Sequence, residues 1–227
     1  MAPFHYSICQ TMAGSAVIVA TSARYFNVPN LAAMGGVLVA SNHQSYLDPV
    51  FIGMCCDRPL HFLARAELFE VPVFGAFIRS LRAHPVRVGQ PDSTALKTMM
   101  RILRAGEPVV LFPEGTRTMD GKIGPFMPGV GSLAVRCGVP LLPVCIEGAF
   151  ECWPRTRLLP RPARVAVAFG EPIEPNEADG RKLTAMLAGR VSTLQMRLRE
   201  YLRGCPCPSL GAAKRASVRP GLAPHIG

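Results

Sequence analysis

The chain has 227 residues, which is enough for one domain with a substantial hydrophobic core. Hydrophobic residues make up 49% of it and mean hydropathy is +0.23, yet no run approaches the roughly 18 to 20 apolar residues of a membrane-spanning helix. The formal net charge of +10 favours anionic partners such as lipid headgroups, phosphorylated substrates or nucleic acid.

The basic residues and the cysteines narrow these possibilities. Of the 25 basic residues only four are lysine, and the planar arginine side chain matches phosphate well. A genome with arginine-rich codon usage gives the same bias. The eight cysteines include no pair of Cys-x-x-Cys motifs, so we expect no zinc site and reduced thiols that face the cytosol.

Residues 1–35 form an apolar lead-in, which we interpret as a membrane-associating segment. It predicts one interfacial helix at about residues 8–24, followed by a turn at Pro29-Asn30. Only His5 precedes the most apolar stretch, so the basic start of an export signal is missing. An apolar-rich chain without a span indicates a protein that lies on a membrane surface.

The next segment carries the first candidate for chemistry. Residues 36–40 are apolar and predict a buried strand, and His43 and Asp48 follow it at a spacing of five residues. This spacing is a little more than one helical turn, so the two side chains can meet at the entrance of a helix. A carboxylate that holds one imidazole nitrogen leaves the other free to act as a general base. A surface or capping pair is the alternative interpretation.

Strands and helices alternate through the middle of the chain. We predict helices at 73–81, at 93–104 with Asp92 or Ser93 as the N-cap, and at 129–137. The predicted strands cover residues 60–64, 85–88, 108–112, 139–146 and 164–169. This alternation is typical of an α/β domain with a mixed, largely parallel sheet flanked by helices.

The last third of the chain changes in character. Residues 181–203 predict an amphipathic helix with leucines at steps of three and four residues and a basic polar face. It is interpreted either as a helix packed on the domain or as a helix on a membrane surface. Residues 204–227 are rich in Pro, Gly and Ala and contain no acidic residue, so we expect a disordered basic tail after a domain at 36–203.

A second motif follows the predicted strand at 108–112, at the edge where open α/β sheets bind ligands. It reads Phe112-Pro113-Glu114-Gly115-Thr116-Arg117-Thr118. Gly115 permits close backbone approach, Thr116 offers a hydroxyl, and Arg117 offers a two-pronged donor for an oxyanion. Arg87, just after another short strand, is a candidate second cation. An ordinary polar turn is the alternative.

Together these motifs resemble the glycerolipid acyltransferase family, the lysophosphatidate (1-acylglycerol-3-phosphate) acyltransferases and their relatives. Four blocks match in order between residues 36 and 148. They are His43-x-x-x-x-Asp48, the segment from Arg65 to Arg87, the Glu114-Gly115-Thr116-Arg117 block, and Val139-Pro140-Leu141-Leu142-Pro143-Val144. The resemblance implies that His43 and Asp48 are catalytic.

The resemblance also implies the reaction. A hydroxyl of a lysophospholipid, activated by His43, attacks an acyl thioester supplied by acyl-CoA or acyl-carrier protein, with no metal or other cofactor. The acceptor phosphate is held by Glu114, Gly115, Thr116 and Arg117 with Arg87, and also by Arg65, where relatives often have a lysine. We expect a peripheral enzyme on the cytoplasmic face of an anionic membrane.

One departure from the family pattern bears on the acceptor. Relatives usually carry a lysine near the position of residues 126–129, where this chain has Phe-Met-Pro-Gly. One phosphate or headgroup contact is therefore absent from this segment, and the acceptor can differ from lysophosphatidate.

Two rival functions fit parts of the sequence. A thioesterase uses the same base with water as the nucleophile, although the chain has no Gly-x-Ser-x-Gly motif of a serine esterase. A basic binding protein explains the charge but not the spacing of His43 and Asp48. Aromatic residues are only 7% of the chain and do not alternate with the basic ones, which disfavours nucleic-acid binding.

Overall fold

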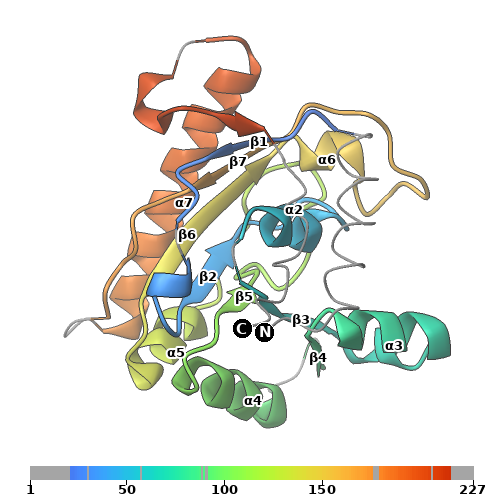
Figure 1. Ribbon diagram of the computed structural model, residues 1–227, viewed down its shortest axis with the longest axis vertical. Coiled ribbons are helices and arrows are strands. Elements are labelled where there is room, and N and C mark those ends of the chain that lie inside the picture. The colour runs from blue at the N-terminus through green and yellow to red at the C-terminus, as the bar shows by residue number, and fades with distance from the viewer. Residues whose placement is uncertain are drawn as a thin grey trace, which may run out of the picture.

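The computed structural model describes residues 21–215, except 30, 57, 88, 90–91, 176–178 and 206. In this part of the chain, eight strands form one sheet in the order β4-β3-β5-β2-β6-β7-β1-β8 (Figure 1). The strands are β1 (Arg24–Phe26), β2 (Leu38–Ser41), β3 (His61–Arg65), β4 (Ala83–Val86), β5 (Val109–Leu111), β6 (Leu141–Glu147), β7 (Ala166–Phe169) and β8 (Lys214–Arg215). The first five in spatial order run parallel, and the β6–β7 and β1–β8 pairs are antiparallel. The predicted mixed, largely parallel α/β fold is confirmed.

Helices cover both faces of this sheet (Figure 1). The helices are α2 (Asp48–Cys55), α3 (Pro72–Ser80), α4 (Ser93–Arg104), α5 (Gly129–Cys137), α6 (Ala149–Cys152) and α7 (Gly180–Leu202), with short 3-10 helices η1 (Leu31–Ala33), η2 (Ala66–Phe69) and η3 (Pro208–Leu210). Side chains alternate along each strand, so β6 sends Leu141 and Cys145 into a core with α4, α5 and α7, and Leu142 and Ile146 into a core with α2 and α6.

Helix α7 is a packing helix, which settles the two interpretations of its sequence. Its apolar stripe lies against α5 and β6 and is buried along its length. Leu183, Leu187, Val191 and Leu198 are each at most 1% exposed. The basic side of the helix is left on the outside, as the amphipathic pattern predicts.

The structure corrects three expectations at the ends of the domain. Residues 24–26 are strand β1, which pairs with β7, rather than the end of a helix over 8–24. Residues 207–215 are not a disordered tail, because Leu210 is fully buried and β8 pairs with β1. The sheet therefore extends beyond the expected limits 36–203 on both sides. These strands have three and two residues, too short for a hydrophobic period to appear in the sequence. The expected helix at 8–20 and the tail after 215 lie outside the described residues.

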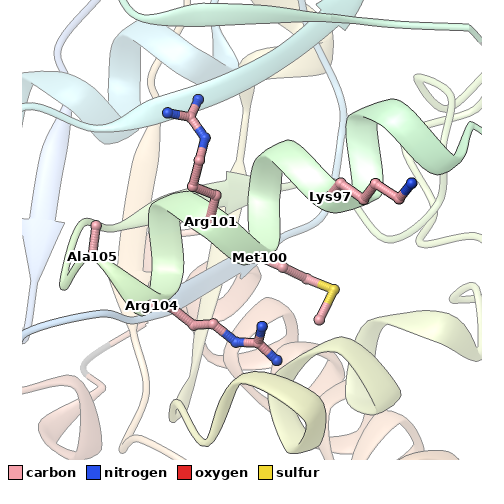
Figure 2. A pocket seen from close by; sticks show the side chains of 5 residues that line it. All are labelled: Lys97, Met100, Arg101, Arg104 and Ala105. Carbon is pink, nitrogen blue, oxygen red and sulfur yellow. The ribbon is translucent and has the colours of Figure 1, made fainter.

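A further surface feature lies away from the carboxyl edge of the parallel strands. A hollow of about 490 Å³ on α4 is lined by Lys97, Met100, Arg101, Arg104 and Ala105. Figure 2 shows Arg101 and Arg104 pointing to opposite sides of the helix. Its Ala105 end leads into the amino end of β5, so the hollow is not part of the site described below. Among the helices that the structure describes, none combines the length and apolar character needed to cross a membrane.

A histidine pair at the amino end of β3 should make folding sensitive to acid. His61 Nδ1 and His84 Nε2 are 2.8 Å apart, and the guanidinium of Arg82 lies 3.2 Å from His61 Nε2. Burial, with His84 and then Arg82 beside it, lowers the pKa of His61 to about 4. Glu107 acts in the opposite direction and Arg101 in the same one.

The sign of the effect follows from these groups. An unfolded histidine titrates near 6.5, so between pH 6.5 and 4 the unfolded chain binds more protons than the folded one. The His61 contribution is present above pH 6.5 and is lost as the pH falls toward 4. We expect His61→Gln to flatten the fall in unfolding free energy over this window, measured by urea unfolding at a series of pH values. Parallel curves for the variant and the wild type would contradict the assignment.

Candidate active site

The site lies at the edge where the parallel strands end. Strands β2, β3, β4 and β5 point their carboxyl ends in one direction, so the segments that follow them share this edge. These segments begin with Asn42 after β2, Ala66 after β3, Arg87 after β4 and Phe112 after β5. The topology thus brings four segments, whose starts are separated by up to 70 residues, to one side of the sheet.

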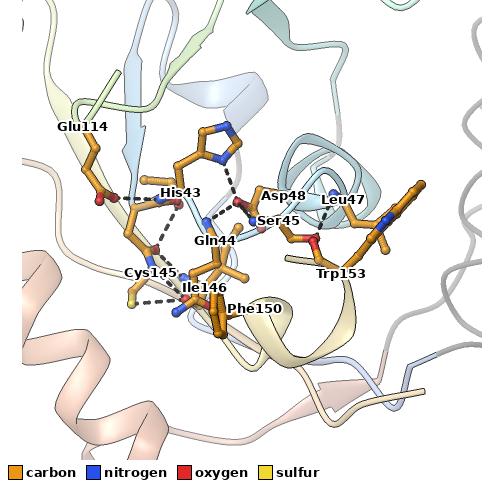
Figure 3. Close-up of polar contacts among 12 residues, drawn as sticks. His43, Gln44, Ser45, Leu47, Asp48, Glu114, Cys145, Ile146, Phe150 and Trp153 are labelled. Atoms are coloured by element: carbon orange, nitrogen blue, oxygen red, sulfur yellow. Dashed lines mark hydrogen bonds and ion pairs between the residues drawn. The ribbon is translucent and has the colours of Figure 1, made fainter. Parts of the chain in front are cut away.

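His43 and Asp48 are in direct contact, as their spacing predicts. The imidazole Nδ1–H donates to Asp48 Oδ2 at 2.7 Å (Figure 3). The same oxygen accepts the backbone N–H groups of Gln44 at 2.6 Å and Ser45 at 2.7 Å. With Nδ1 held as a donor, Nε2 carries the lone pair that can accept a proton.

Asp48 lies at the start of a helix, and one of its carboxylate oxygens collects several hydrogen-bond donors. Asp48 is the first residue of α2, where the backbone N–H groups of the helix start favour negative charge. Its side chain is fully buried, and Oδ1 has no hydrogen-bond partner among the described residues. The hydrogen bonds that hold the Asp48 side chain are therefore the three that Oδ2 accepts.

The imidazole of His43 is also held by a ring that the sequence analysis did not single out. Phe112 stacks on it with ring centroids 4.0 Å apart and an interplanar angle of 17°. His43 keeps about a fifth of its side-chain surface exposed, so one side of the ring remains open. The ring is therefore oriented by Asp48 and Phe112 and still reachable by a substrate.

Glu114 holds the backbone of the segment that carries His43. Its Oε1 accepts the N–H of His43 at 2.8 Å (Figure 3). Its Oε2 accepts the N–H of Gly124, also at 2.8 Å. Burial raises the pKa of the Glu114 carboxyl, and these two hydrogen bonds oppose the rise. On the other side, the N–H of Thr118 donates to the His43 carbonyl at 2.9 Å. Glu114 was expected to bind substrate, and in this structure its two oxygens hold the loops together.

Arg117 lies over the catalytic segment with spare hydrogen-bonding capacity. Its guanidinium carbon is 3.4 Å from the ring centre of Tyr46. Tyr46 lies between His43 and Asp48 in the sequence, so the cation lies over the segment that joins them. Its Nη1 is buried and has no hydrogen-bond partner among the described residues. Gly115 reaches this arrangement with φ near +69°, a conformation that favours glycine.

Arg155 is a further cation at this motif that the sequence analysis missed. Its Nη1 donates to Thr116 Oγ1 at 3.3 Å, although 39 residues separate the two. Arg155 lies on the loop after α6, and the fold places this loop next to the Glu-Gly-Thr-Arg block, which no local sequence pattern indicates. Arg155 is therefore a candidate replacement for the basic contact that is absent from residues 126–129.

The structure places Arg65 and Arg87 at the same edge but farther along the sheet. Arg65 ends β3 and pairs in register with Val86, the residue before Arg87. Both arginines are exposed, and among the described residues the ion-pair partner of Arg65 is Glu67, at 3.9 Å. They lie two and three strands from β2, so they flank His43 rather than contact it.

Asn42 and Gln44, on either side of His43 in the sequence, are further positioning residues to which the sequence analysis assigned no role. The Asn42 side chain donates to the Ile146 carbonyl and accepts from the Ile146 N–H, both at 2.8 Å, and so joins the end of β2 to β6. Gln44 donates to Glu147 at 3.2 Å and to the Gly121 carbonyl at 3.3 Å. Their place beside His43 in the sequence was the available signal.

This geometry defines a class of protein: an α/β domain that presents a hydrogen-bonded histidine–carboxylate pair beside arginines at the carboxyl edge of its sheet. The family model described as Acyltransferase matches residues 23–147, more than half of the chain. The chain belongs to this family. The match begins one residue before β1, in agreement with the corrected start of the domain.

Relatives agree with this assignment. The chain is 27% identical over 198 residues to the 1-acyl-sn-glycerol-3-phosphate acyltransferase of Bacillus subtilis, covering 86% of this chain and 96% of that protein. It is 32% identical over 142 residues to a chloroplastic 1-acyl-sn-glycerol-3-phosphate acyltransferase of Brassica napus, covering 61% of this chain but only 41% of that protein.

A solved structure extends the agreement to three dimensions. The crystal structure of the 1-acyl-sn-glycerophosphate acyltransferase PlsC from Thermotoga maritima matches with a TM-score of 0.75 at 26% identity. The match covers 86% of this chain and 78% of that one.

Proposed function

We propose that this protein transfers a fatty acyl group from an acyl thioester to the free hydroxyl of 1-acylglycerol-3-phosphate, which gives phosphatidate. The observation that carries the proposal is the 2.7 Å contact of His43 with a buried carboxylate beside a buried, unsatisfied arginine nitrogen. The names of the Bacillus, Brassica and Thermotoga relatives support the choice of acceptor.

The chemistry needs one base and a nucleophile that the acceptor supplies. His43 Nε2 takes the proton of the acceptor hydroxyl while its oxygen attacks the thioester carbonyl carbon. The carbon–sulfur bond then breaks, and the leaving thiolate takes the proton back from the imidazolium. Asp48 holds the imidazole orientation and stabilises the positive charge that forms on it. No acyl-enzyme forms, so neither a nucleophilic residue nor a cofactor has a part in the proposed steps.

The arginines supply the binding of the acceptor phosphate. The buried Nη1 of Arg117 has no hydrogen-bond partner among the residues that the structure describes, and a phosphate oxygen that accepts its N–H removes the free-energy cost of leaving it unpaired. Gly115 and Thr116 directly precede Arg117 in the sequence, and Arg155 donates a hydrogen bond to the Thr116 hydroxyl. Arg65 and Arg87 extend the positive surface along the edge. A phosphate held here presents the hydroxyl to His43 with little orientation left to lose.

The donor and the place of reaction belong to the same proposal. Acyl-CoA and acyl-carrier protein both present the required thioester, and we propose one of the two as the donor. Because the acceptor is a lipid and the net charge is +10, we propose peripheral association with the cytoplasmic face of an anionic membrane.

The test is thiol release from acyl-CoA with and without lysophosphatidate. Release that depends on the acceptor supports acyl transfer, and equal release without it supports a thioesterase. Failure across a panel of donors and acceptors would overturn the enzyme assignment.

Arg117→Ala should separate acceptor binding from chemistry. Loss of a charge-assisted contact of about 1.5–3 kcal/mol predicts a rise in the acceptor KM of roughly 10- to 100-fold. The donor KM should stay at its wild-type value. Arg136→Ala removes an exposed arginine of α5 and serves as the control. A higher donor KM with an unchanged acceptor KM would assign Arg117 to the thioester instead.

A further inference from the structure

The loop between α6 and β7 combines exposed leucines with a one-sided charge. Residues 153–164, here named the arginine–leucine loop, contain four arginines and no acidic residue. At its tip, Leu158 is 88% exposed and Leu159 is 69% exposed. Adjacent leucines in water, between cations, are typical of a segment that inserts into a lipid surface while arginines bind the phosphates.

Hydrogen bonds brace the base of this loop. Arg161 donates its Nε–H to the Glu151 carbonyl at 2.6 Å and its backbone N–H to the Cys152 carbonyl at 2.9 Å. The indole N–H of Trp153 donates to the Arg157 carbonyl at 3.1 Å. The leucine tip is thus presented on a fixed frame, which lowers the entropy lost when it binds.

The arginine–leucine loop is also continuous with the active site. The carbonyl of Trp153 accepts the hydroxyl of Ser45 at 2.9 Å, and the Trp153 ring lies 5.3 Å from that of Tyr46. Arg155, near the start of the loop, donates to Thr116. Trp153 therefore joins the arginine–leucine loop directly to the segment that carries His43, and a membrane that binds the leucine tip would lie close to the active site.

We propose that the arginine–leucine loop docks the enzyme on an anionic bilayer, with Leu158 and Leu159 among the acyl chains, next to the site that receives the lipid acceptor. This inference rests on the proposed function for the identity of the acceptor. Helix α3 also exposes apolar side chains, including Val73, but η2 beside it carries Glu67 and Glu70. An acidic protein such as a carrier of acyl groups would match the arginines but leave the two leucines in water.

Vesicle sedimentation of the full chain tests the docking surface. The vesicles are phosphatidylcholine alone and phosphatidylcholine mixed with phosphatidylglycerol. We expect Leu158→Ser/Leu159→Ser to weaken partitioning onto the mixed vesicles by at least about tenfold. Wild-type binding should fall with added salt. Arg181→Gln/Arg190→Gln removes two exposed charges of α7 and should change binding much less. If both double variants weakened vesicle binding equally, the leucine tip would have no specific role in binding, and the proposal would be overturned.

A site-specific probe covers the other outcomes. Tryptophan at Leu158 should be quenched by brominated phosphatidylcholine in mixed vesicles beyond the signal of Trp153, the one native tryptophan. A probe that brominated lipid does not reach, but that a purified acidic acyl-carrier protein shields from acrylamide, would assign the loop to that protein. A probe shielded in the free enzyme would indicate that another part of the chain covers the tip. Either result overturns the proposal.

These measurements separate this inference from the proposed function. Sedimentation and quenching use no substrate, so they remain readable if the chain proves not to transfer acyl groups. Conversely, the leucine double variant should keep wild-type activity on a water-soluble short-chain lysophosphatidate and lose it on vesicle-embedded acceptor. Activity on both acceptors at wild-type rates would leave acyl transfer in place and remove the role of the loop.

Discussion

His43→Ala should reduce kcat by about 10²- to 10⁴-fold with little change in the KM of either substrate. A positioned general base contributes a factor of this size, because it takes the proton as the nucleophile attacks. His43 is the histidine that Asp48 orients and that Phe112 stacks on, while its Nε2 is left to accept. The measurement is steady-state thiol release with saturating acceptor, together with a melting temperature for the folded state.

A matched histidine makes the result specific. His84→Ala removes another partly buried histidine, which pairs with His61 at the opposite end of the parallel strands. We expect its kcat near neutral pH to stay close to that of the wild type. If the His43 variant kept wild-type kcat while folded, the dyad would not be the catalytic base. A fall in kcat equal in both variants would indicate a general loss of stability instead.

The sequence predicts the elements of this fold well where they are long and amphipathic. The helix from Ser93 has the expected cap, since Asp92 accepts the N–H groups of Thr94 and Ala95. The strands β2, β5 and β6 are apolar runs, because both of their faces are buried. Strands β1 and β8 escaped prediction because three and two residues are too few to show a strand period, although Tyr25 and Phe26 of β1 are buried in the cores.

In the candidate site, contacts between residues close in sequence were predictable, and contacts between distant residues were not. His43 and Asp48 are close in sequence, so their contact follows from local geometry. Glu114 shows the limit of this reasoning. Its position in a polar motif indicated a ligand contact, whereas the fold directs its oxygens to the backbone of His43 and Gly124. Arg155 lies 39 residues from Thr116, and no local pattern joins them. Long-range contacts of single side chains depend on strand order, which a single sequence does not contain.

Asp48→Asn should isolate the contribution of charge to catalysis. In the wild type, Oδ2 accepts from His43 and two backbone N–H groups, while Oδ1 has no partner among the described residues. An asparagine that places its carbonyl oxygen at the Oδ2 position keeps all three hydrogen bonds. The reverse orientation would aim its NH₂ group at three donors. The tautomer of His43 is therefore preserved, and the negative charge is lost.

We expect kcat of Asp48→Asn to fall by about 10²- to 10⁴-fold, since the imidazolium that forms during proton transfer loses its counter-charge. The acceptor KM should stay near the wild-type value, because Asp48 Oδ2 contacts His43, Gln44 and Ser45 and none of the residues proposed to hold the phosphate. Asp179→Asn is the control, since Asp179 caps α7 through the Arg181 N–H and asparagine caps a helix equally well. A folded Asp48→Asn enzyme with wild-type kcat would mean that Asp48 serves only to orient His43, and that its negative charge does not contribute to the transition state.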